Sequence, residues 1–182
     1  MKICKGTGRT AFVGEHFTIK VPRPDIGRAI SNLRESTGSG VRGVLECIAG
    51  TEGNARSLRF ALTRGISENL RERDLSKTEM DILVPTRASI LGLVNIQDTA
   101  RDVDIKNNEI YEAFWKRLVS LPDIRDEDER IIRAGGHTLP QSKNYGLHEG
   151  TIKLRDYGER DLKELLTKYG HLLREAILEK TR

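Results

Sequence analysis

Two oxygen-bearing side chains flank a predicted hairpin in the last quarter of the chain. Asn144 and Asp156 stand twelve residues apart. The segment between them predicts two short strands joined by a turn at 149–150, because Ile152 and Leu154 alternate with charged residues. Mg²⁺ prefers a carboxylate together with phosphate oxygens over a closed protein cage. Asn144 and Asp156, brought together by the hairpin, are therefore candidate Mg²⁺ ligands, and the alternative is that Asp-Tyr-Gly at 156–158 is an ordinary turn.

A second candidate is the glycine-rich turn near the N-terminus. The sequence Gly-Thr-Gly-Arg-Thr-Ala over residues 6–11 fits G-x-G-x-x-A and lies between two predicted strands. In a dinucleotide-binding Rossmann site a helix follows the glycines, so a second strand disfavours that site. The arrangement favours a flap whose backbone N–H groups lie over phosphates, with Gly6 and Gly8 as nucleotide-binding residues. The alternative is that both glycines serve only a tight turn.

A lysine on the next predicted strand can complete a phosphate site. Lys20 lies twelve residues after Gly8, on a strand predicted for residues 17–21 that Pro22 and Pro24 end. Apolar residues occupy the odd positions of this strand, which leaves Lys20 on the other face. A lysine that faces a cleft beside a glycine flap can hold the α- and β-phosphates of a nucleotide, and a carboxylate must hold it in place.

The candidate carboxylate is Glu72. It lies on a helix predicted for residues 55–77, where an apolar residue recurs every four positions: Leu58, Leu62, Ile66 and Leu70. Glu35 and Glu68 are the competing candidates. For any of the three, the alternative is an exposed helix glutamate.

The other predicted elements give an α+β fold. In the first part we expect a helix over 25–35 with Asp25 as its N-cap and two apolar strands: 82–84 and 89–96. Between that helix and the long one we expect only loops and turns, built around Gly38, Gly40, Gly43, Gly50 and Gly53. The later part predicts helices over 109–121 and 126–133 and a C-terminal amphipathic helix of about twenty residues. We predict two parts of one structural unit, residues 1–98 and 99–182.

Composition limits the class of protein. The chain has 182 residues, of which 37% are hydrophobic and 32% charged, with a formal net charge of +4, and this argues for a folded protein and against disorder. No apolar stretch is long enough to span a bilayer or to act as a signal peptide. Cys4 and Cys47 are too few for a disulfide framework, and we expect both to be reduced. A cytoplasmic protein without membrane contact is the expectation.

Taken together, these residues resemble the protein-kinase superfamily, and most closely the short kinase-like proteins of bacteria and bacteriophages. The chain order is that of a kinase: glycine loop, strand lysine, helix glutamate, metal-binding asparagine, and an Asp-Tyr-Gly triplet at 156–158 in place of Asp-Phe-Gly. The resemblance touches residues 3–21, 66–98 and 137–158. It implies a minimal kinase-like fold with a small β-rich N-terminal lobe, a truncated helical C-terminal lobe, and ATP and Mg²⁺ as cofactors. It also predicts that Lys20 and Asp156 contact one triphosphate.

Two departures from the kinase pattern bear on mechanism. His137 lies seven residues before Asn144, as the catalytic loop requires, but Leu139 occupies the position of the catalytic aspartate. Leucine cannot accept a proton, and general-base catalysis is worth ~10²–10⁴ in rate. Only 24 residues follow Gly158 in the sequence, and we therefore expect the usual platform for a peptide substrate to be absent.

Three functions follow, in order of preference. The first is an ATP- and Mg²⁺-binding kinase-like protein, weakly active or inactive, that acts by binding another protein. The second is an active serine/threonine-type phosphotransferase, or a nucleotidyl transferase, that uses a non-standard base. The third is a basic nucleic-acid-binding or inhibitory protein that binds no nucleotide.

Overall fold

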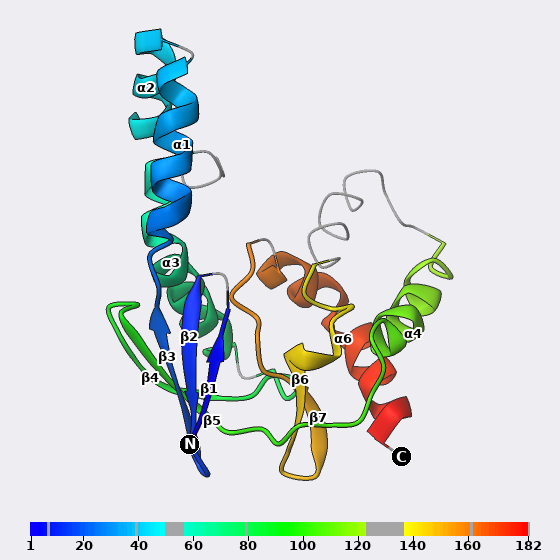
Figure 1. Cartoon of the computed structure of the whole chain (residues 1–182). Coiled ribbons are helices and arrows are strands. Elements are labelled where there is room, and N and C mark those ends of the chain that lie inside the picture. Colours follow the sequence, from blue (N-terminus) through cyan, green and yellow to red (C-terminus); the bar gives the residue numbers. More distant parts are fainter. Residues whose placement is uncertain are drawn as a thin grey trace. The chain divides into compact units, whose positions relative to one another are not determined.

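The structure is a computed structural model of the chain, and it describes seven stretches. These are residues 1–6, 8–38, 40–49, 57–78, 80–122, 137–160 and 162–181. Helices and an antiparallel sheet occur together, so the predicted α+β class is confirmed. Figure 1 shows the elements with their labels.

The chain forms two compact units. The first comprises Met1–Leu70 and Arg87–Gln97, and the second comprises Arg71–Thr86 and Asp98–Arg182. Residues 71–86 pack with the second unit, whereas residues 87–97, which follow them in the chain, pack with the first.

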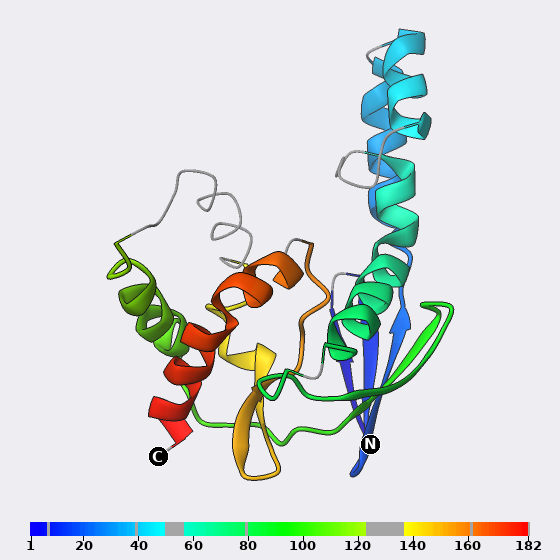
Figure 2. The ribbon, with the colours of Figure 1, turned by 180° about the vertical axis from the view of Figure 1, so that it is seen from behind.

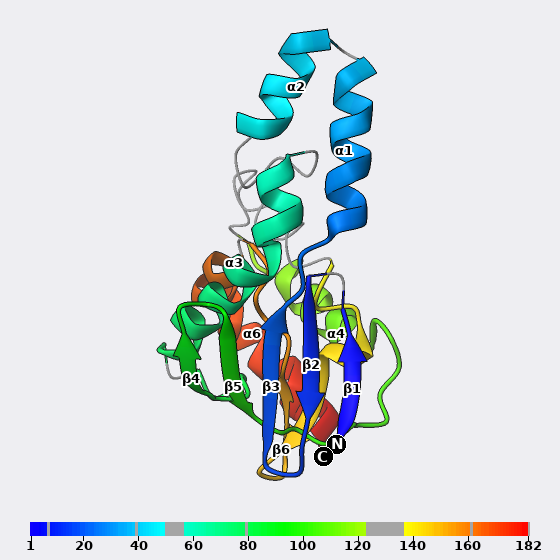
Figure 3. The same cartoon turned by 60° about the vertical axis from the view of Figure 1, so that its left-hand side comes forward.

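The first unit contains a five-stranded sheet. Its strands lie in the order β1-β2-β3-β5-β4, which Figure 3 shows side by side. Their bounds are β1 Lys2–Lys5, β2 Arg9–Val13, β3 Phe17–Pro22, β4 Thr86–Ile90 and β5 Val94–Asp98. The first three form an antiparallel meander in which Ala11 lies opposite Lys20. The predicted strands and the turn at Gly14, whose N–H donates to Phe17 O, are confirmed.

Residues of β3 alternate between the two faces of the sheet. The face that carries the polar residues is the buried one, and the face that carries the apolar residues is exposed. Thr18 and Lys20 are 9% and 7% exposed, whereas Phe17 and Ile19 are 52% and 40% exposed. The register places Ile3, Phe12 and Ile19 next to one another across three strands, on the exposed face. In β3, the buried face is thus the one that carries polar side chains.

The segment between β3 and the long helix differs from the prediction. Helix α1 (Ile26–Gly38) begins where expected, and Asp25 Oδ1 accepts a hydrogen bond from Arg28 N–H at 2.9 Å as its N-cap. The predicted glycine loop is wrong, because Gly40–Ala49 forms a second helix, α2. An apolar stripe at helical spacing (Val41, Leu45 and Ile48) outweighs the roughly 1 kcal/mol that an interior glycine costs a helix. The predicted turns at Gly50 and Gly53 lie outside the described residues.

The predicted long helix is confirmed as α3, Leu58–Ser76. Its Gly65 lies against the glycine turn, since a Cβ added there would fall 2.0 Å from Gly8 O and 2.9 Å from Pro22 Cα. This position allows no side chain. A glycine in the middle of a helix weakens the helix locally. A glycine is required at position 65 because Gly8, where the glycine turn meets β2, lies so close to it.

The strand prediction for residues 82–96 is wrong in detail. A turn interrupts the predicted strand 89–96, so that β4 and β5 form a hairpin, and Leu93 N–H donates to Ile90 O at 2.8 Å. Leu91 and Gly92 both have positive φ, 49° and 73°. Residues 82–84 make only an isolated bridge between Leu83 and Leu154.

The second unit packs two helices and a hairpin around one core. It contains α4 (Glu109–Leu118), a 3₁₀ turn (Ser142–Asn144), β6 (Tyr145–His148), β7 (Thr151–Leu154) and α6 (Leu162–Thr181). Figure 2, the view from behind, shows α4 beside α6. The predicted apolar stripe of α6 is confirmed as buried: Leu162, Leu165, Tyr169, Leu172, Leu173 and Ile177. The predicted helix 126–133 lies outside the described residues.

Candidate functional site

Lys20 is buried beneath α3 in the first unit. Its backbone carbonyl accepts a hydrogen bond from Asn69 Nδ2 at 3.3 Å, which ties β3 to the helix. A lysine side chain is seldom this buried unless its ammonium group is paired. The side chain therefore does not serve as an ordinary solvated strand lysine.

A buried polar network includes the Asn69 side chain that binds Lys20 O, and it was not predicted from the sequence. Arg9 pairs with Glu68 at 3.2 Å and donates to Asn69 Oδ1 at 3.2 Å. Asn69 Nδ2 also donates to Gly92 O at 2.8 Å, and Asn95 Nδ2 donates to Asn69 O at 2.8 Å. Asn69 thus links α3 to β2, to β3 and to the β4–β5 hairpin. The signal in the sequence was the run of polar residues at alternate positions of β5, Asn95 and Gln97, which are both buried.

The glycine turn has a structural role of its own. Gly6 N–H donates to Arg9 O at 2.8 Å, which closes the turn between β1 and β2. Gly8 O accepts from Arg23 N–H at 2.8 Å and lies against Gly65. These contacts account for both glycines without a ligand. Phosphate binding by Gly6 and Gly8 stays a prediction.

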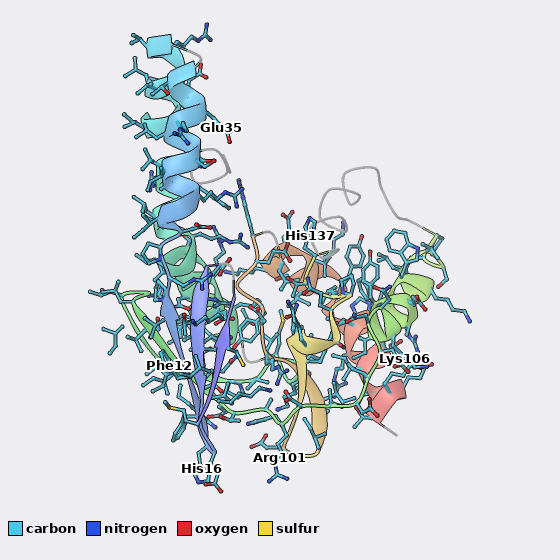
Figure 4. The ribbon with its side chains drawn as sticks, viewed as in Figure 1. Phe12, His16, Glu35, Arg101, Lys106 and His137 are labelled. Atoms are coloured by element: carbon cyan, nitrogen blue, oxygen red, sulfur yellow. The ribbon has the colours of Figure 1, made fainter. Side chains whose placement is uncertain are left out.

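The three candidate glutamates have different surroundings. Glu35 is exposed, accepts a hydrogen bond from Ser31 at 3.2 Å, and lies on α1 away from the strands of its unit (Figure 4). Glu68 is engaged by Arg9 and by Arg64, the latter at 2.6 Å. Glu72 is fully buried in the second unit, where its Oε1 accepts a hydrogen bond from Tyr157 N–H at 3.3 Å. Of the three, Glu72 therefore contacts the Asp-Tyr-Gly triplet.

Tyr157 fixes the backbone of that triplet. Its ring is 1% exposed, and its hydroxyl donates to Val84 O at 2.6 Å and lies 3.1 Å from Thr86 Oγ1. Together with the bond to Glu72, these contacts hold the residue after Asp156 at both its backbone and its side chain. Asp156 itself is half-buried.

The hairpin brings Asn144 and Asp156 to one end, as predicted. Tyr145 pairs with Leu154 in register, and Arg155 N–H donates to Asn144 O at 2.8 Å. Asn144 Nδ2 donates to Thr138 O at 2.8 Å, so its Oδ1 is the atom of the amide that suits a cation. Within the described residues, no group of three or more His, Cys, Asp or Glu side chains could hold a metal ion. A cation at this end would take its other ligands from phosphate or water.

The predicted catalytic loop lacks an acidic group at the expected position. Leu139 is 1% exposed and belongs to the core, and its carbonyl accepts a hydrogen bond from Tyr145 Oη at 2.9 Å. Burial raises the pKa of Tyr145 above its ordinary value, so this hydroxyl stays protonated. A carboxylate does lie nearby, because Thr138 Oγ1 donates to Glu159, a residue that the sequence analysis overlooked.

Comparisons with protein-family models, with curated proteins and with solved structures found no match. No helix in the described part of the chain is long and apolar enough to cross a membrane.

Proposed function

We propose that the protein is a minimal protein-kinase-like protein that binds ATP with Mg²⁺ and transfers phosphoryl groups weakly or not at all. The observation that carries the proposal is the hydrogen bond from Tyr157 N–H to the Glu72 carboxylate. In protein kinases, the ion pair between the strand lysine and a helix glutamate and the contact of the Asp-Phe-Gly aspartate with Mg²⁺ must both be in place. Here the buried glutamate anchors the triplet that carries Asp156.

Each remaining residue has a role in this proposal. Lys20 lies on the third strand, where protein kinases carry the lysine that holds the nucleotide phosphates. The turn at residues 6–8 covers the phosphates. Asn144 and Asp156 hold Mg²⁺, with phosphate oxygens and water completing its octahedral shell.

Weak or absent transfer follows from Leu139. A side chain in the hydrophobic core can neither orient a hydroxyl group nor accept its proton. Loss of a general base lowers the rate by ~10²–10⁴, whereas the metal ligands are unaffected. Binding and chemistry therefore separate in this protein.

A second candidate function is an active phosphotransferase or nucleotidyl transferase that uses another base. The observation that favours it is the contact between Glu159 and Thr138, the residue just before Leu139. This contact places a carboxylate beside the loop where a base is expected. Under this second function, Glu159→Gln abolishes transfer from ATP and leaves ATP affinity unchanged.

The proposal also includes a protein partner and a cytoplasmic setting. A kinase-like protein without strong catalysis acts through what it binds, and ATP would bias that binding. Neither Cys4 nor Cys47 is part of a disulfide, which suits a compartment that keeps thiols reduced.

The test is a calorimetric titration of ATP with and without Mg²⁺. We expect Mg²⁺-dependent binding by the wild type and at least about tenfold weaker binding by Lys20→Met, which loses a charge-assisted contact. The matched control is Lys5→Met, which removes an exposed lysine from β1 of the same sheet and should bind as the wild type does. Equal loss in both variants, or no ATP binding by the wild type, contradicts the proposal.

A further inference from the structure

Helices α1 and α2 form a hairpin that exposes six large aliphatic side chains. Each is 38–79% exposed: Ile26, Ile30, Leu33, Val41, Leu45 and Ile48. Single exposed apolar residues are ordinary, but a contiguous apolar patch on a folded protein marks an interaction surface. These six residues are called the hairpin face below.

The six side chains lie on one side of the hairpin. In each helix they stand at positions i, i+4 and i+7, which form a single stripe. The buried side of α1 contains Ala29 and Asn32, and that of α2 contains Cys47. Successive residues of an α-helix are about 100° apart around its axis. In both helices the apolar stripe therefore lies roughly 100° around the axis from the buried side, and the direction of this rotation, viewed along the chain, is the same. The two helices pack side by side and run in opposite directions (Figure 3). With the buried side of each helix turned toward the other, the same rotation places both stripes on one face.

The charges of the hairpin argue against an anionic partner. Residues 25–49 contain three arginines and three acidic residues, whereas the whole chain has a net charge of +4. Nucleic acids and anionic membranes are recognised by an excess of positive charge, which this hairpin does not have. An electrically balanced apolar face suits another protein surface that is itself balanced.

We propose that the hairpin face binds the same face of a second copy of this chain and forms a four-helix bundle. In an antiparallel contact between the two α2 helices, with Leu45 near the two-fold axis, Val41 lies against the second copy's Ile48. The same register sets Arg42 near the second copy's Glu46. Arg42 and Glu46 already form an ion pair within one chain at 2.9 Å. In the dimer each Arg42 can pair with the second copy's Glu46 instead, so the number of ion pairs stays the same.

The size of the face fits a modest dimer. The two helices have 13 and 10 residues, and specific interfaces use about 20–30 residues a side. Only one side of each helix takes part, so the face is smaller than a standard interface and falls in the range of weak, transient ones. We therefore expect a reversible dimer, and its mass will depend on protein concentration.

The mass in solution tests the proposal. Sedimentation equilibrium of the full chain over a range of concentrations should approach twice the chain mass of 20.5 kDa. Leu45→Glu and Leu33→Glu should each weaken the dimer at least about tenfold, because each buries a charge in the interface. The matched control is Leu178→Glu on α6, because Leu178 and Leu33 are both helical leucines that are 38% exposed. A wild type that stays monomeric at every concentration, or a control that dissociates as far as Leu33→Glu, overturns the proposal.

A cross-link distinguishes a second copy from another partner. In a Cys4→Ser background, which removes the exposed native thiol, Leu45→Cys places a thiol near the proposed axis. Mild oxidation of purified protein should give a covalent dimer for Leu45→Cys and not for Leu178→Cys. Equal cross-linking of both, or none in either, contradicts pairing through the hairpin face.

Discussion

The carboxylate of Glu72 accepts a hydrogen bond from the backbone N–H of Tyr157 across 85 positions of the sequence. Glu72 is fully buried, and Tyr157 is held a second time where its hydroxyl donates to Val84 O. A buried glutamate is costly unless it is hydrogen-bonded, so this contact stabilises the fold and also sets the position of Asp156.

Replacing this glutamate should destabilise the protein measurably. Glu72→Leu keeps the approximate volume but leaves Tyr157 N–H without its acceptor, and an unsatisfied buried donor costs about 1–3 kcal/mol. The matched control is Glu35→Leu, which removes an exposed helix glutamate and should change the free energy of unfolding by about 0.5 kcal/mol or less. Urea denaturation measures both. Equal stability of the two variants would show that the bond to Tyr157 contributes nothing.

The close approach at Gly65 predicts a strong effect from a single methyl group. Gly65→Ala places a Cβ 2.0 Å from Gly8 O, and the backbone there cannot move without disturbing β2 and β3. We expect a loss of at least about 2 kcal/mol, as for overpacking of a tight core. Gly38→Ala meets no atom within 4 Å and should be neutral or slightly stabilising. Thermal unfolding that ranks the two variants in the opposite order contradicts this packing.

The part of the site around Asn144 and Asp156 could be predicted, because residues close to them in the sequence determine its structure. The alternation around Ile152 and Leu154 predicts the hairpin, and the hairpin by its geometry brings Asn144 and Asp156 to one end. The stripe of α6 and the N-cap Asp25 are local signals of the same kind.

What could not be predicted depends on contacts between distant residues. The β4–β5 turn was not predicted, because leucine is not a turn-forming residue and Leu91 occupies the turn at positive φ. A distant residue stabilises this turn: Asn69 of α3 donates a hydrogen bond to Gly92 O. Helix α2 was missed because its glycines favour a loop by propensity, whereas its apolar stripe favours a helix. Glu72 was preferred to Glu68 from the sequence, but its hydrogen bond to Tyr157 joins residues 85 positions apart, and sequence spacing does not contain that contact.

The burial of Leu139 predicts that an aspartate cannot simply be restored there. Leu139→Asp would place a carboxylate in the core, where burial raises its pKa above the unfolded value of about 3.9. The ionised form is then penalised only in the folded state, so stability is lost as the pH rises above that value. Leu139→Asn is the matched control, because it has nearly the same shape and does not titrate.

The measurement is the free energy of unfolding of both variants between acidic and neutral pH. We expect Leu139→Asp to approach Leu139→Asn at acidic pH and to fall below it at neutral pH. Parallel pH profiles would mean that the side chain at residue 139 reaches solvent and that the position is open to a catalytic base.

The most direct test of the account is the Mg²⁺ dependence of ATP binding in Asp156→Ala. If Asn144 and Asp156 hold the metal, wild-type affinity for ATP should rise when Mg²⁺ is added, and the variant should lose most of that rise. The control is Asp104→Ala, which removes an exposed aspartate from the same unit and should retain the wild-type response. Calorimetry of the three proteins with and without Mg²⁺ measures the difference. A wild type whose ATP affinity ignores Mg²⁺, or an Asp156→Ala variant that responds to Mg²⁺ as fully as Asp104→Ala does, would contradict the account.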